Sequence, residues 1–289
     1  MILLILPLHL AAFAGELRIE SPDRNIVVRI ENSERITWSA IYKGRTIIDE
    51  SALGFEFSGE EPMSGNFIIT DHTFRTVNEK WTPVVRSKHS EIADNYNELH
   101  IFLREKSGSL RKMELTFRAY NDGIAFQYKL FRGSVIGNRE ITKELTTFAI
   151  PGDPKAWVVE YGGYNSSNES EFFEHPLSYI SEKTIAGMPL LMEYGNNCWI
   201  AITEAKIRNY AAFYIGTDGK TNILATKLVP LPGEPETGTK VRFDDEITTP
   251  WRIVMIGNNP GTLIESEIIQ NLNDPCALSD VSWIKTGLC

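Results

Sequence analysis

An alternation of apolar and polar residues with a period of two runs through most of this chain and constrains its fold more than any other feature. Successive side chains of a strand point to opposite faces, so this pattern predicts half-buried β-strands. The clearest runs cover residues 36–42, 99–103, 113–119 and 124–130, and strand-like runs recur at 189–202, 207–215, 223–229 and 251–256. The pattern favours an all-β protein.

Turn signals separate these runs. Lys43-Gly44 joins the first run to residues 45–48, and Thr217-Asp218-Gly219-Lys220 is a second turn. The clearest hairpin has Asn121-Asp122-Gly123 at its tip, because these residue types tolerate positive φ. Many short strands joined by such turns predict a sandwich or barrel rather than a βαβ fold.

Few stretches compete as helices. The best covers residues 260–272, where Ile264, Ile268 and Leu272 recur every four residues after a Pro-Gly opening. Ile268-Ile269 could instead close as a strand. We find no internal repeat and no interdomain linker, so residues 15–289 are expected to form one β domain with few short helices.

Length and charge narrow the class of protein. The chain has 289 residues, 42% of them hydrophobic, and 29 Lys+Arg against 38 Asp+Glu give a formal net charge of −9. That is enough apolar material for one large sandwich. The acidic balance, without any cluster of basic residues, argues against a nucleic-acid partner.

Residues 1–14 are expected to be a signal peptide, and the protein to be exported. They form an apolar run too short to span a bilayer, ending in Ala12-Phe13-Ala14, a small-x-small cleavage pattern. No Lys or Arg precedes the run, which leaves two alternatives: a start further upstream, or a buried strand. The cysteines Cys198, Cys276 and Cys289 can form at most one disulfide, and Cys198 lies in an expected core strand.

Most familiar catalytic and metal motifs are absent. The segment 233–240 has the wrong order of residues for a phosphate loop, and no nucleophile elbow or dinucleotide fingerprint occurs. The five histidines lack zinc spacing. Asp244-Asp245-Glu246 is expected to be a solvated turn rather than a calcium loop.

The most informative stretch is 157–173, WVVEYGGYNSSNESEFF, which we expect to be an irregular loop. It mixes carboxylates (Glu160, Glu169 and Glu171) with aromatic rings (Tyr161, Tyr164, Phe172 and Phe173). Rings pack against the C–H faces of sugars, and carboxylates bind hydroxyls or calcium. A sugar or calcium site is one interpretation, and an exposed polar loop is the other.

Several segments together resemble the N-terminal domain of glycoside hydrolase family 97, over residues 17–285. They are SPDRNIVVRI (21–30), YKGRTII followed by LGFEF (42–57), NYNEL (95–99), FRAYNDGIAFQY (117–128), TPWRIVMIG (249–257) and NLNDPCALSDVSWIK (271–285). The family is typified by exported bacterial α-glucosidases and α-galactosidases. The resemblance implies a β-supersandwich of the galactose-mutarotase kind and a periplasmic or extracellular location.

In that family a (β/α)₈ barrel follows this domain and carries both catalytic carboxyl groups. Neither maps onto this chain, so the resemblance implies a carbohydrate-binding module that is not an enzyme by itself and is truncated before its barrel partner. It also implies that one loop glutamate completes a calcium site at the barrel mouth. The family's Tyr-Asp-x-x-Glu run maps best onto residues 164–169, with one residue inserted. Glu169 is the predicted ligand, with Glu171 or Glu160 as alternatives, and Tyr164 and Tyr161 are the predicted contacts to an α-glucoside or α-galactoside.

Two rival hypotheses belong to other classes. One is a complete mutarotase-like sugar epimerase, which needs a histidine and a carboxylate on one concave face and could draw on His72, His89, His100 or His175. The other is a scaffold or adhesion sandwich without a sugar site.

Overall fold

The computed structural model describes residues 15–285, apart from 86, 134–138 and 196. The predicted signal peptide (residues 1–14) and Cys289 lie outside the described residues. Within this part of the chain no helix is long and apolar enough to cross a membrane.

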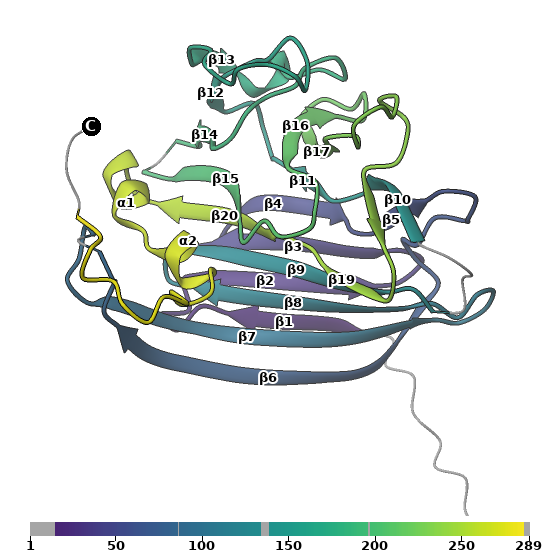
Figure 1. The fold of residues 1–289 in the computed structure, drawn as a ribbon, viewed down its shortest axis with the longest axis horizontal. Coiled ribbons are helices and arrows are strands. Elements are labelled where there is room, and N and C mark those ends of the chain that lie inside the picture. The colour runs from purple at the N-terminus through teal and green to yellow at the C-terminus, as the bar shows by residue number, and fades with distance from the viewer. Residues whose placement is uncertain (1–14, 86, 134–138, 196, 286–289) are drawn as a thin grey trace, which may run out of the picture.

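Two large antiparallel sheets form the molecule (Figure 1). The first runs in the order β1 (Glu16–Glu20), β2 (Ile26–Asn32), β3 (Ile36–Tyr42), β4 (Arg45–Ala52), β11 (Thr147–Ala149), β17 (Ile223–Leu228) and β16 (Phe213–Thr217). The second runs in the order β13 (Phe173–Pro176), β12 (Lys155–Val158), β14 (Leu190–Glu193), β15 (Trp199–Ala205), β20 (Trp251–Gly257), β9 (Gly123–Phe131), β8 (Lys112–Tyr120), β7 (Ile92–Glu105) and β6 (Phe67–Trp81), with β19 (Glu246–Thr248) paired to β9. A small sheet of β18 (Val241–Phe243), β10 (Arg139–Glu144) and β5 (Phe55–Phe57) lies at one end. The predicted all-β sandwich is confirmed.

The core lies between the two sheets, and the alternation identifies its residues. Inward-facing Leu99, Ile101 and Leu103 of β7 are at most 2% exposed. Trp38 of β3 is 1% exposed and meets Phe126 of the opposite sheet with ring centroids 4.9 Å apart. Cys198 is buried in the same cluster, as predicted, and Cys276 is exposed.

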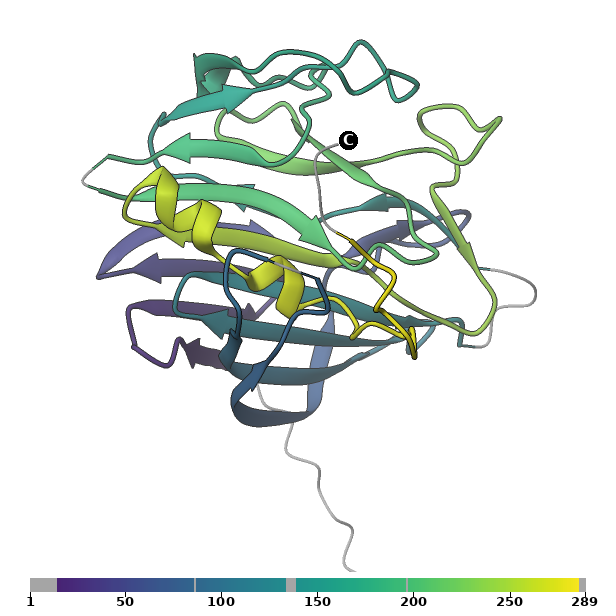
Figure 2. The same ribbon diagram turned by 60° about the vertical axis from the view of Figure 1, so that its left-hand side comes forward.

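A second apolar cluster lies on the outer face of the larger sheet, partly covered by two short helices. Figures 1 and 2 both show α1 (Pro260–Glu265) and α2 (Ile268–Asn271) lying against the sheet beside β20. The predicted helical stretch is therefore confirmed as two helices, and the strand alternative for Ile268-Ile269 is wrong. A 3₁₀ turn, η1 (Leu177–Tyr179), completes the helical elements of the described residues.

The predicted turns are present in the structure, but the glycine of one turn is required for a different reason than the one predicted. Lys43 and Gly44 have φ values of 49° and 80°, which match the twist of the flanking strands. The hairpin at Asn121-Asp122-Gly123 has no positive φ at any of the three residues. A Cβ at Gly123 would lie 2.7 Å from the Ile268 Cδ1 atom and the Val254 carbonyl oxygen, so packing under α2 requires this glycine.

Three expected boundaries are wrong. Residues 189–202 contain all of β14 and the start of β15, which pair antiparallel, instead of one strand. The strand expected at 207–215 begins only at Phe213, after positive φ values at Lys206 and Asn209 bend the chain. The stretch 157–173 is not wholly irregular, because Trp157 belongs to β12 and Phe173 begins β13.

Candidate functional site

Backbone hydrogen bonds hold the first residues of the loop between β12 and β13 in place. Glu160 forms an isolated bridge with Ala186, and the Tyr161 amide donates to the Ile185 carbonyl at 3.0 Å. The Gly187 amide donates to the Val159 carbonyl at 2.9 Å, and a side chain at Gly187 would collide with the Tyr161 ring. The loop therefore leaves the sheet at a defined place, at the end of the molecule opposite β6 (Figures 1 and 2).

Three tyrosines hold the first half of the loop. The rings of Tyr161 and Tyr164 have their centroids 5.8 Å and 5.7 Å from that of Tyr214 on β16. The Tyr164 hydroxyl donates to Glu236 at 3.5 Å. Burial, followed by the negative charge of Glu236, raises the pKa of Tyr164 to about 12. Both predicted sugar contacts are thus half-buried and already packed, with only part of each ring facing solvent.

The three candidate glutamates differ in their surroundings. All are exposed, but Glu160 accepts a hydrogen bond from the Tyr179 hydroxyl at 2.9 Å. Glu169 and Glu171 make no ion pair within the described residues. Asn168 has a φ of 59° and accepts from the Tyr214 hydroxyl at 3.1 Å, which fixes the backbone immediately before Glu169.

The second half of the loop ends in two exposed aromatic side chains. Phe172 and Phe173 are 51% and 57% exposed, directly after the unpaired carboxylate of Glu171. The end of the loop therefore presents apolar surface to solvent.

The loop alone does not provide a metal centre. No three His, Cys, Asp or Glu side chains gather to hold an ion anywhere in the described part of the chain. Calcium takes 6–8 oxygen ligands. One carboxylate at Glu169 fits the role of a single ligand, and the other ligands would have to come from elsewhere.

The histidines named for the mutarotase hypothesis lie on different elements. His100 Nε2 is 3.2 Å from Glu114 on the outer face of the large sheet, and His89 Nδ1 is 3.0 Å from Glu267 beside α2. His175 on β13 stacks on Tyr179 with centroids 3.8 Å apart, whereas His72 lies on β6. They do not converge on one cavity.

Sequence reasoning missed a buried ionic cluster. Arg252 of β20 is fully buried and forms a bidentate pair with Glu144, through Nε at 2.9 Å and Nη2 at 2.6 Å. Its Nη1 donates to Glu204 at 2.6 Å, and Tyr210 donates to Glu144 at 3.0 Å. One signal was available: an arginine inside the apolar run at 251–256 requires buried partners.

Comparison with known proteins identifies the family. The family model described as "Glycosyl-hydrolase 97 N-terminal" matches residues 19–275. The chain is 25% identical to a retaining alpha-galactosidase of Bacteroides thetaiotaomicron over 93% of its own length, and 27% identical to a probable retaining alpha-galactosidase of Streptomyces bingchenggensis over 84%.

Solved structures agree. A Glycoside Hydrolase Family 97 enzyme from Pseudoalteromonas sp. strain K8, in complex with acarbose, superposes with a TM-score of 0.86 and 30% identity over 93% of this chain. A beta-arabinopyranosidase, at 21% identity and a TM-score of 0.71, shares the fold.

The matched region is one part of longer proteins. The chain spans 43% and 35% of the length of the Bacteroides and Streptomyces relatives, and 40% of the Pseudoalteromonas chain. The family match and these superpositions agree with the all-β sandwich built above. The chain belongs to glycoside hydrolase family 97, as its N-terminal domain.

Proposed function

We propose that this chain is the noncatalytic N-terminal module of an exported glycoside hydrolase that acts on α-galactosides or α-glucosides. In this proposal the module presents the loop 160–173 to a catalytic (β/α)₈ barrel. The exposed Phe172 and Phe173 carry the proposal, because they form an apolar surface beside Glu169 and Glu171, which make no ion pair among the described residues.

The module's contribution to a shared site would be one carboxylate. Glu169 follows the anchored Asn168, whereas Glu160 already accepts the Tyr179 hydroxyl. A ligand on an anchored backbone loses less conformational entropy when it binds. These contacts favour Glu169 over Glu160, and Glu171 stays the alternative. Calcium bound there would supply charge stabilisation and positioning at the barrel mouth.

Sugar contact would use the outer edges of the tyrosines. The rings of Tyr161 and Tyr164 pack on Tyr214 and keep fixed positions, so they would offer rigid apolar surface at little entropic cost. The names of the Bacteroides and Streptomyces relatives favour an α-galactoside.

An assay of the purified chain tests the noncatalytic role. Hydrolysis of a glycoside needs two carboxyl groups that flank the scissile bond, and neither catalytic carboxyl group of the family maps onto this chain. We expect no hydrolysis of aryl α-galactosides or α-glucosides, and no calcium binding at micromolar concentration by calorimetry. The full-length Bacteroides relative serves as the positive control. Turnover that follows the chain through two unrelated purification steps would contradict the proposal.

A further inference from the structure

A cavity of about 1130 Å³ opens at the far end of the large sheet, away from the loop 160–173. It lies where β7 turns into β8, beside β5 and β10, at the right-hand end of Figure 1. Its lining includes two aromatic rings, Phe102 and Phe131. It also includes four cations (Arg104, Arg111, Lys112 and Arg139) and three carboxylates (Glu60, Asp71 and Glu114).

Two cations line this cavity without a carboxylate partner. Arg104 and Lys112 are directly opposite each other in the register of β7 and β8, and both are exposed. Neither forms an ion pair in the part of the chain that the structure describes. Like charges directly opposite on adjacent strands destabilise a sheet. A bound anion would relieve the repulsion between Arg104 and Lys112.

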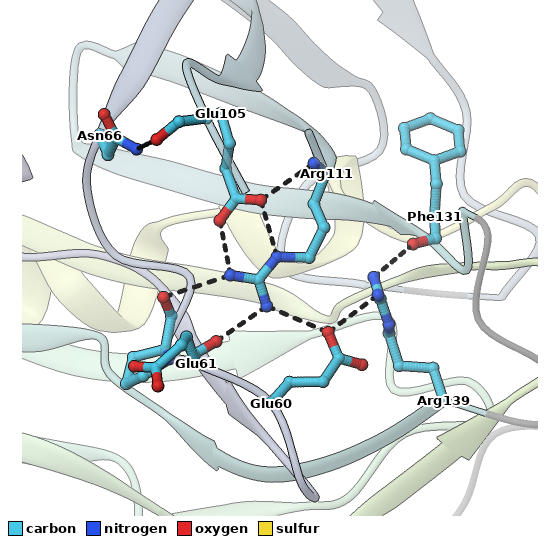
Figure 3. Close-up of polar contacts among 9 residues, drawn as sticks. Glu60, Glu61, Asn66, Glu105, Arg111, Phe131 and Arg139 are labelled. Carbon is cyan, nitrogen blue, oxygen red and sulfur yellow. Dashed lines mark hydrogen bonds and ion pairs between the residues drawn. The ribbon is translucent and has the colours of Figure 1, made fainter. Parts of the chain in front are cut away.

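The floor of the cavity is a rigid network centred on Arg111 (Figure 3). Arg111 Nε donates to Glu105 at 2.8 Å, and its Nη1 donates to the Glu61 carbonyl at 2.8 Å and to Glu60 at 3.2 Å. This network ties the β7–β8 hairpin to the loop that follows β5. Arg104 and Lys112 therefore extend from a fixed hairpin.

Arg139 is the second buried cation of this network. Its side chain is 2% exposed, and its Nη2 shares the Glu60 oxygen with Arg111 at 3.1 Å. Its Nε is buried and has no acceptor among the residues that the structure describes. Burial, reinforced by the neighbouring Arg111 and opposed by Glu60, lowers the pKa of Arg139. The cavity floor thus sets two buried cations, Arg111 and Arg139, against two carboxylates, Glu60 and Glu105.

Aromatic rings provide the apolar part of the lining. Phe102 is half-buried on the same face as Arg104 and stacks on His100 with centroids 4.5 Å apart. Phe131, at the end of β9, is also half-buried. Ring faces beside cationic donors suit a ligand that has both a C–H face and an anionic group.

We propose that this cavity binds an acidic saccharide, whose carboxylate or sulfate group is held by Arg104 and Lys112 while a sugar ring packs on Phe102. Both anions present oxygens to the same donors, so the shared chemistry is a negative group on a pyranose ring. This site is separate from the loop proposed to meet the barrel, and it does not depend on calcium.

Calorimetry on the purified chain at low ionic strength tests the proposal. The probes are tetragalacturonate, a sulfated galactose tetrasaccharide, neutral maltotetraose and inorganic sulfate. We expect at least one acidic saccharide to bind, and to bind at least about tenfold more tightly than the neutral saccharide and inorganic sulfate, as loss of a charged hydrogen bond implies. The acidic probe that binds identifies the anion as a carboxylate or a sulfate.

Charge-neutralising variants locate the site. Arg104→Gln or Lys112→Gln should each weaken binding about tenfold, without lowering the melting temperature, because each removes a like-charge neighbour. Lys220→Gln makes the same charge change in the distant β16–β17 turn and should leave affinity unchanged, as should Glu169→Gln. Failure of both acidic saccharides to bind, equal weakening by Lys220→Gln, or sulfate binding as tightly as the saccharide would overturn the proposal. None of these outcomes bears on the barrel-facing loop.

Discussion

Replacing Arg252 by leucine should lower the free energy of unfolding by about 3–5 kcal/mol, the usual effect of removing one partner from a buried ion pair. Arg252 is fully buried, and its guanidinium binds both Glu144 and Glu204. The leucine would leave two buried carboxylates without a cation. Chemical denaturation of the purified chain measures this loss.

The pH dependence and a control make the Arg252 prediction specific. Burial already raises the pKa of Glu204, although Arg252 opposes the shift. Without Arg252 the Glu204 carboxylate should take up a proton more readily, so the loss of stability in the variant should shrink as the pH falls. Lys143→Ala, which breaks a half-exposed pair with Asp218, should cost less than about 1 kcal/mol. Equal losses from the two variants would contradict the burial argument.

Replacing Trp38 by alanine should cost about 3–5 kcal/mol, as large-to-small changes of buried tryptophan do. The indole is surrounded by Phe126 at 4.9 Å and Phe148 at 5.8 Å between ring centroids, and its Nε1 donates to the Thr147 carbonyl at 3.3 Å. Close packing on both sides leaves little room for the core to collapse into the space.

The matched control is Trp283→Ala, since Trp283 is 66% exposed. That change should stay within about 0.5 kcal/mol of the parent. Thermal unfolding followed by circular dichroism compares the two variants. A Trp38→Ala protein as stable as the Trp283→Ala protein would show that the two sheets do not pack through this cluster.

Patterns among neighbouring residues predicted which faces of the strands are buried and where one tight turn lies. Alternation identified the buried faces of β7, β8 and β9, since side-chain direction in a strand follows directly from position. Turn chemistry placed the β3–β4 turn at Lys43-Gly44. The role of Gly123 was misassigned because its constraint comes from α2, which lies about 145 residues away in sequence.

Long-range contacts account for the features that sequence reasoning missed. Trp157 belongs to a strand because β13 and β14 pair on either side of it. No residue near Trp157 in the sequence indicates these two partner strands. The cation pair at Arg104 and Lys112 depends on the register of β7 against β8. For the candidate site, the sequence pointed to the loop 157–173 but not to Tyr214 or Glu236, which anchor this loop from β16 and from a distant loop.

The central claim is that one loop glutamate completes a calcium site whose other ligands come from a catalytic barrel. It is tested by an enzyme in which residues 15–285 replace the N-terminal domain of the Bacteroides relative. Calcium affinity and α-galactoside hydrolysis are measured together. We predict that Glu169→Gln weakens both by at least about tenfold, the scale of effect expected when a metal site loses support, and that Glu171→Gln changes neither. A fused enzyme that tolerates Glu169→Gln but loses calcium with Glu171→Gln would assign the role to Glu171, and one that tolerates both would contradict the shared site.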